Sequence, residues 1–326
     1  MKKSLMALAA LACTGSAMAQ TDATLYGRID ASLGATKLNG VSTTQLYNGN
    51  LTNSRWGIRG SEDLGGGLKA SFQLETAFNA DDGVGSAGFS RQSWIGLGGG
   101  FGLVRMGKAD SIYKDIFDLG NTYNISADSQ FNSAVEAYRA GLGAYVARPN
   151  NQIRYDSPNF GGFSAGLTYS LDEEVAGTPK VSAIGARYRT GNLDVGIAYQ
   201  DEDQLVKAND REHTTVGATY NFGSVRLSAQ YQKVQAGDNR KDNEMAFGVN
   251  VPLGNLELTA GYSRSKAKNA AGAASSKGAA FALAATYALS KRTRVYGGYL
   301  DGETENAAGV ATRDYRLYAV GIRHDF

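Results

Sequence analysis

The feature that most constrains this fold is an alternation of apolar and polar residues, repeated in segments of about ten residues. Within residues 68–78, for example, Leu68 and Phe72 share one face, and Lys69 and Gln73 share the other. This pattern predicts β-strands, because successive side chains of a strand point to opposite sides of the sheet. We count 16 such segments from Ala23 to the C-terminus, so the sequence predicts an all-β protein.

The connections between these segments separate a membrane barrel from a soluble β-sandwich. Short turns, such as residues 98–102 and 190–192, alternate with longer polar segments. Short turns on one side and long loops on the other are typical of outer-membrane barrels, whereas a sandwich has no such rule. Aromatic residues also collect at the ends of the apolar faces, as they do at membrane interfaces. The sequence therefore predicts a transmembrane antiparallel β-barrel of 16 strands. The longer segments are residues 172–180, 201–212, 234–243 and 266–277.

The overall composition is compatible with this prediction. The mean hydropathy is −0.30, and no apolar run approaches the ~18 residues of a membrane helix. A strand-built membrane protein has this composition because every second residue of each strand faces away from the lipid.

The N-terminus has the features of a secretory signal peptide. Lys2 and Lys3 precede an apolar segment at residues 5–13, and residues 17–19 read Ala-Met-Ala, a small-residue cleavage site. We expect residues 1–19 or 1–20 to be cleaved off and the remainder of the chain to be exported.

The expected mature chain, residues 21–326, is a single barrel domain. Cys13 raises a lipoprotein alternative, but the residues before it form a poor lipobox, and cleavage downstream removes it. Without cysteine, the mature chain has neither a disulfide framework nor a thiolate metal site. Loss of Lys2 and Lys3 lowers the 33 basic residues to 31, equal to the 31 acidic ones. This neutrality argues against a nucleic-acid binder.

Residues 109–151 interrupt the alternation. A loop of this length is usually functional or disordered, and its many apolar residues favour a folded insertion that packs against another part of the protein. Within it, Phe131, Ala134, Val135 and Tyr138 have helical spacing, with Asp128 or Ser129 as the expected N-terminal cap and Gly141 as the expected end.

Several short motifs resemble those of Gram-negative outer-membrane general porins, of the 16-stranded trimeric type found in β-proteobacteria. The resemblance covers the whole mature chain. The motifs are Thr24-Leu25-Tyr26-Gly27, Ser54-Arg55-Trp56-Gly57, Gly60-Ser61-Glu62-Asp63-Leu64-Gly65, Phe89-Ser90-Arg91-Gln92, Arg154-Tyr155-Asp156-Ser157-Pro158-Asn159-Phe160 and Arg323-His324-Asp325-Phe326.

This resemblance implies a homotrimer in the outer membrane, in contact with its lipid and lipopolysaccharide. It implies that the third loop, residues 109–151, folds into the lumen and narrows it, and that the loop matching residues 80–90 contacts a neighbouring subunit. The C-terminal Phe326 would be part of the signal read by the barrel-assembly machinery. The channel would pass small hydrophilic solutes.

The polar faces of the strands are rich in arginine, and rings of basic residues suit the passage of anions. Family resemblance places Arg55, Arg91 and Arg154 on the constriction wall. The alternative for each is a merely solvated or paired charge, and Arg91 is ambiguous because Trp94 and Ile95 cannot both face lipid. The candidate basic wall comprises Arg28, Arg55, Arg59, Arg91, Arg105 and Arg154.

Carboxylates of the third loop would face this wall across the gap and create a transverse field. Asp115 and Asp118 are the first choices. The family's Pro-Glu-Phe-Gly motif is absent from this loop, which leaves the choice of acids open. The candidate loop acids are Asp110, Asp115, Asp118, Asp128 and Glu136.

Three other motifs carry weaker functional hypotheses. Gly162–Gly166 matches the nucleophile elbow around Ser164, but it lies in an alternating strand rather than a strand–turn–helix. Residues 102–108 mimic a phosphate-binding loop but lack its Ser or Thr. Acidic pairs such as Asp81-Asp82 could hold Ca²⁺ or Mg²⁺, although a solvated charged loop is the favoured explanation. We expect no resident cofactor.

The sequence thus predicts a passive diffusion channel that prefers anions. One alternative is a porin specific for carboxylates, phosphate or sugars, and a remote one is an outer-membrane hydrolase that uses Ser164.

Overall fold

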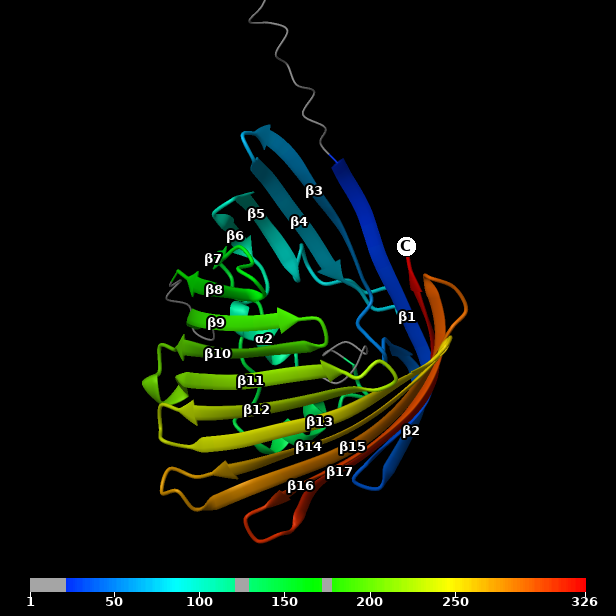
Figure 1. The fold of residues 1–326 in the computed structure, drawn as a ribbon. Helices are drawn as coiled ribbons and strands as arrows, with labels where there is room; N and C mark the ends of the chain where they lie inside the picture. Colours follow the sequence, from blue (N-terminus) through cyan, green and yellow to red (C-terminus); the bar gives the residue numbers. More distant parts are fainter. Residues whose placement is uncertain (1–21, 121–128, 172–177) are drawn as a thin grey trace, which may run out of the picture.

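The computed structural model describes residues 22–120, 129–171 and 178–326, and strands dominate them. Every pairing between neighbouring strands is antiparallel, and the sheet runs continuously from β1 to β17 (Figure 1). The strands are β1 (Asp22–Leu38), β2 (Val41–Asn48), β3 (Arg55–Gly65), β4 (Leu68–Ala77), β5 (Gln92–Gly99), β6 (Gly102–Lys108), β7 (Gln152–Asp156), β8 (Phe163–Ser170), β9 (Lys180–Thr190), β10 (Leu193–Asp203), β11 (Arg211–Asn221), β12 (Arg226–Ala236), β13 (Lys241–Leu253), β14 (Leu256–Lys268), β15 (Ala274–Ala288), β16 (Thr293–Asn306) and β17 (Ala311–Asp325).

The labelled strands form a closed barrel of 16, because β2 and β3 pair with successive halves of one edge of β1. The other edge of β1 pairs with β17 and closes the sheet. Phe326 completes this seam, since its N–H and C=O exchange hydrogen bonds of 3.0 and 2.9 Å with Gly27. The predicted 16-stranded antiparallel barrel is confirmed.

Residues 49–54 separate β2 from β3 and bend into the barrel. Asp30 of β1 holds this bend: its carboxylate accepts from the Thr52 N–H at 2.9 Å, and its own N–H donates to the Ser54 hydroxyl at 3.0 Å. Leu51, at the tip, is 1% exposed and belongs to the same apolar cluster as Phe131. The sequence pattern did not predict this inward bend.

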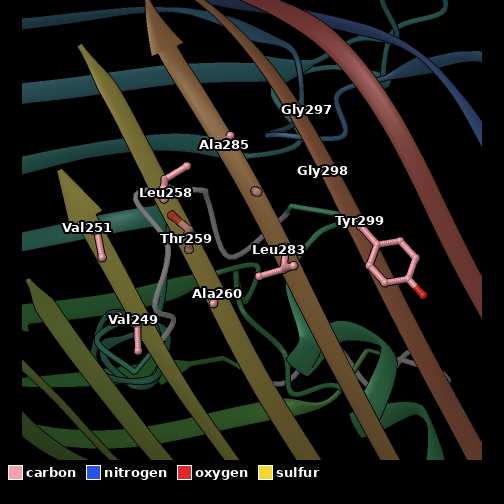
Figure 2. A pocket seen from close by; sticks show the side chains of 11 residues that line it. Val249, Val251, Leu258, Thr259, Ala260, Leu283, Ala285, Gly297, Gly298 and Tyr299 are labelled. Atoms are coloured by element: carbon pink, nitrogen blue, oxygen red, sulfur yellow. The ribbon is translucent and has the colours of Figure 1, made fainter. Parts of the chain in front are cut away.

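The outer face of the barrel carries the apolar side chains. Leu25 is 61% exposed and Ile95 is 59% exposed, as expected of residues that face lipid rather than water. Figure 2 shows part of this face, where Val249, Leu258 and Leu283 flank an apolar groove formed by β13–β16. The exposure of Ile95 resolves the ambiguity at β5, because Trp94 then points inward and stacks with Arg105 at 5.1 Å.

Several predicted long loops are much shorter. Strands extend into the segments expected to be loops, so that β12 and β13 are joined by residues 237–240, and β14 and β15 by residues 269–273. Val234 and Asp242, both assigned to a loop from sequence, pair across these strands. Polar residues can continue a strand because the ladder requires only backbone groups. The predicted loop at residues 172–180 lies partly outside the described residues.

Residues 109–151 join β6 to β7 and are called the inward loop below. Their described parts fold into the barrel as predicted. Its described parts contain α2 (Ile112–Phe117), α3 (Ser133–Ala137) and η1 (Tyr138–Ala140), while η2 (Lys207–Asn209) lies elsewhere. Figure 1 shows α2 behind β9 and β10, on the concave side of the sheet. Among the described residues, no helix is long and apolar enough to cross a membrane.

The predicted helix near residue 134 is present but is capped differently. The side chain of Asn132 accepts from the Ala134 N–H at 3.0 Å and caps α3, so Ser129 is not the cap. Instead, the Ser129 hydroxyl donates to the Asn50 carbonyl at 2.8 Å and ties the loop to the inward bend. Asp128 lies outside the described residues, and Gly141 ends η1 as expected. The sequence did not indicate α2.

Glycines on the inner wall allow the inward loop to pack closely. A Cβ at Gly185 of β9 would lie 2.8 Å from Ile112 Cγ1, and one at Gly298 of β16 would lie 2.6 Å from the Phe131 ring. Side chains at these wall positions would push the loop away. Because these wall positions are glycines, α2 and the segment before α3 can pack directly against the wall.

We expect Gly298→Leu to displace the Phe131 ring and to destabilise the folded barrel by about 1–3 kcal/mol. Urea-induced unfolding and single-channel conductance would measure the two effects. Gly297→Leu is the matched control, because the nearest atom to a Cβ there is Val320 Cγ1 at 3.5 Å, an ordinary contact on the outer face. Equal effects of the two substitutions would contradict the proposed packing role.

We also expect Phe326→Ala to lower the yield of folded barrel, because it removes the ring that lies against Gly27 at the closing seam. Heat-modifiable mobility in gel electrophoresis would measure the folded fraction. Tyr318→Ala is a suitable control, since Tyr318 is an outward aromatic of the same strand and is 54% exposed. A yield unchanged relative to this control would exclude a special role for Phe326.

Candidate functional site

The candidate site is the lumen where the inward loop approaches the arginine-rich strands. α2 packs against β8–β11, and α3 packs against β14–β16, so the loop covers that part of the wall. The strands β1 and β3–β7 carry the candidate basic residues on the remaining wall. This arrangement places the loop on one side of the lumen and most of the candidate arginines on the other.

Polar contacts fasten the loop to the wall behind it. The Tyr113 hydroxyl donates to Gln232 of β12 at 2.5 Å, and the Val146 N–H donates to the Glu202 carboxylate of β10 at 2.6 Å. Ser133 and Ser263 exchange a hydrogen bond of 2.7 Å between α3 and β14. Sequence reasoning missed these tethers because the wall residues lie far from the loop along the chain.

Two of the candidate arginines share a single carboxylate. Glu75 of β4 lies 2.7 Å from Arg91 Nε and 3.6 Å from Arg55 Nε. Arg91 precedes β5, so strand alternation does not set its direction, and its N–H also bonds to the Glu75 carbonyl at 3.0 Å. The structure therefore brings Arg55 and Arg91 together as one cluster around Glu75.

A second carboxylate shared by two arginines lies at the seam of the barrel. Asp325 of β17 pairs with Arg28 at 2.5 Å and with Arg323 at 2.9 Å. Arg294 of β16 lies directly opposite Arg323 in the strand register. Neither Arg294 nor Arg323 was among the residues predicted for the constriction, although both stand on polar strand faces.

Arg154 has a different environment from the other candidate residues. Its side chain is 3% exposed, donates to the Asp110 carbonyl at 2.7 Å, and pairs with the carboxylates of Asp115 and Asp156. Arg105 also pairs with Asp156, at 2.6 Å. Arg154 therefore fastens the start of the inward loop to β7, in addition to contributing charge.

The described loop acids each have a basic partner nearby. Asp110 pairs with Arg148 within the loop at 2.6 Å, and Asp118 pairs with Lys114. Burial lowers the pKa of Lys114, but the Asp118 and Asp110 carboxylates outweigh this effect and raise the pKa above its usual value. Asp115 is joined to Arg154 directly rather than across an open gap.

Glu136 of α3 is buried and pairs with two guanidinium groups. Arg139 lies 3.0 Å from it, and Arg313 of β17 is also in contact with it. Glu136 therefore connects the loop to the wall rather than facing the other arginines. Asp128 lies outside the described residues.

Arg59 and Ser164 lie away from the loop contacts. The Arg59 guanidinium stacks on the Tyr26 ring at 5.0 Å. Ser164 lies within β8 and pairs with Arg187 in the strand register, without the turn that a nucleophile elbow requires. Within residues 22–120, 129–171 and 178–326, no group of three or more potential metal-binding side chains occurs.

Comparison with other sequences identifies the family. A family model described as Gram-negative porin matches residues 5–307. Outer membrane porin protein 32 of Delftia acidovorans is 36% identical over 99% of this chain and 95% of its own length. The major outer membrane protein P.IB of a Neisseria meningitidis serogroup A strain is 32% identical, and the alignment covers 100% of both proteins.

Solved structures agree with this result. An anion-selective porin from Comamonas acidovorans superposes with a TM-score of 0.79 at 32% identity, covering 94% of this chain and 100% of that one. OmpT of Vibrio cholerae, in a trimer form, has a TM-score of 0.74 at 16% identity, over 94% of this chain and 99% of its own, which is a likeness of fold. The chain therefore belongs to the Gram-negative porin family, and it is a channel protein of the outer membrane rather than an enzyme.

Proposed function

We propose that this porin prefers anions and that the shared-carboxylate arginine clusters cause the preference. The carrying observation is that two arginines share one carboxylate at Glu75 and again at Asp325. The cluster at Asp325 has two guanidinium groups for one carboxylate, and arginine keeps its positive charge at any physiological pH. A narrow lumen with low-dielectric walls concentrates the field of such charges and raises the local anion concentration.

A third cluster has the same composition. Arg187 and Arg189 of β9 both pair with Asp194 of β10, at 2.5 and 2.7 Å. The formal charge of the whole chain, +2, does not reflect this local surplus, because it sums lumen, loops and signal segment. The related Comamonas structure, described as anion-selective, supports the proposal for this chain.

The loop side of the lumen contributes to the same preference. Its described acids are neutralised by Lys114, Arg148 and Arg154, so they do not offset the arginine clusters on the facing wall. Arg154 has a double role in this proposal, because its removal would also release the loop at Asp115.

The double substitution Arg55→Ala and Arg91→Ala should lower the anion-to-cation permeability ratio by at least roughly twofold, because it removes two positive charges beside Glu75. The reversal potential of a planar bilayer in a salt gradient measures this ratio. Lys291→Ala is the control, since it removes one positive charge from an exposed turn outside the lumen. A cation-selective wild-type channel would contradict the proposed anion preference, and an unchanged ratio in the double variant would contradict the role of Arg55 and Arg91.

We also propose that the protein functions as a homotrimer. The loop between β4 and β5 presents exposed apolar surface at Val84, which is 62% exposed, and Phe89 packs edge-on against the outward Trp56 at 6.4 Å. Exposed apolar loop surface next to an outward aromatic is suited to contact with a second copy. The Vibrio cholerae structure described in a trimer form supports this proposal by its fold.

Analytical ultracentrifugation in a density-matched detergent should therefore give three times the chain mass. Val84→Asp should weaken the assembly, because it introduces a charge into the proposed contact. Val310→Asp is the control, since Val310 is equally exposed in another loop, at 59%. A monomer mass for the wild-type protein would reject the trimer.

A further inference from the structure

The inward loop encloses a cavity of about 580 Å³ that the anion path proposed above does not use. Its volume falls within the range of about 300–1,000 Å³ typical of small-molecule sites. Gln232 of β12 and Glu244 of β13 line it from the barrel wall, and the inward loop supplies the other lining residues. Val135 and Arg139 on its lining are exposed, so the cavity is accessible from the lumen.

Two buried polar atoms on this lining have no hydrogen-bond partner among the described residues. They are Glu244 Oε1 and the Tyr138 hydroxyl oxygen. The other carboxylate oxygen of Glu244 accepts from the Gln232 amide, so that side chain is held in position. Buried polar atoms without partners are uncommon because they lose their bonds to water without replacement. A bound solute that contacted these atoms would supply the missing hydrogen-bond partner.

The wall behind the cavity also carries two neighbouring carboxyl groups. Asp242 and Glu244 are both 0% exposed and stand two residues apart on the inward face of β13. Asp242 accepts from the Ser265 hydroxyl at 2.9 Å, and within the described chain neither carboxylate has a cationic partner. A positively charged group of a solute would complement them.

Aromatic rings line the same space. Phe117 and Tyr145 are packed with ring centroids 4.8 Å apart, and Tyr138 of η1 also lines the cavity. Aromatic faces attract ammonium groups and also bind apolar bodies. The rings therefore suit either the cationic end or an apolar side chain of the solute.

The loop side of the cavity carries basic residues. Arg139 has a side chain that is 50% exposed, and its carboxylate partner Glu136 is shared with Arg313. Lys114 and Arg148 stand on the same lining, each beside an aspartate. A carboxylate reaching Arg139 would gain a charge-assisted hydrogen bond.

We propose that this cavity binds a zwitterionic solute, with an ammonium group at Glu244 and Tyr138 and a carboxylate at Arg139. A free α-amino acid with an apolar or aromatic side chain has this chemistry. The proposal rests on the channel function proposed above, because the solute reaches the cavity through the lumen. It adds a binding step for one solute class to a passive, anion-preferring path.

Three probes at pH 7 test the proposal on the full-length protein: phenylalanine, phenethylamine, which lacks the carboxylate, and 3-phenylpropionate, which lacks the ammonium group. Calorimetry in detergent should show saturable binding of phenylalanine, and each analogue should bind at least roughly tenfold more weakly. Single-channel recordings should show phenylalanine lowering the conductance over the same concentration range.

Glu244→Gln should weaken phenylalanine binding at least roughly tenfold, because it removes the charge while keeping the shape of the side chain. Glu257→Gln is the matched control, since Glu257 of β14 lies outside the cavity beside Asn250. The conductance of each variant without solute shows whether the loop keeps its position. Should Glu244→Gln alter that basal conductance, Arg139→Gln provides a second variant with the same expected loss.

Equal binding of phenylalanine and 3-phenylpropionate would identify a plain anion site and overturn the proposal. Absence of phenylalanine binding to the wild-type protein would also overturn it. The reversal potential of the same channels separates this failure from failure of the proposed function. An anion-selective channel without phenylalanine binding contradicts only the zwitterion site.

Discussion

The whole structure depends on closure of one antiparallel sheet. In a bilayer, backbone N–H and C=O groups have no water to bond, so each strand needs a neighbour on both edges. The pairing of β1 with β17, completed by the bonds between Gly27 and Phe326, provides this for the first and last strands. Closure also creates an interior that is separated from lipid. Polar side chains on the inner faces can then line a lumen, while the apolar faces contact the membrane.

The inward loop uses this interior through contacts of two kinds. Small wall residues, such as Gly185 and Gly298, accept Ile112 and Phe131 at short distance. Ionic and hydrogen-bonded tethers, such as Arg154 with Asp115, then fix the direction of the loop. Close packing makes the loop position discrete, because an interior at crystal-like density tolerates little displacement. The shape of the lumen thus depends on the glycines of the wall as much as on the side chains of the loop.

The charges of the lumen have different roles according to their partners. Arg55 and Arg91 share Glu75, and we propose that their positive charges act on passing ions. The described loop acids each pair with a basic residue, and several of these pairs hold the loop in place. The two sides of the cavity carry different groups: the Glu244 carboxyl on the wall and the Arg139 guanidinium on the loop. The two proposals therefore assign anion attraction to the arginine-bearing wall and binding of a zwitterionic solute to the cavity.

The sequence by itself determined the barrel, its strand number and the inward loop, because side-chain alternation is a local property that each strand repeats. Arginine on the inner face was predictable for the same reason, since residues two apart share a face. Only the tertiary structure decided which charges meet. Arg28 and Asp325 are 297 residues apart and become neighbours through closure of the sheet. The bend at residues 49–54, the pairing of Arg154 and the cavity at Glu244 likewise depend on the register between distant strands, which no local pattern specifies.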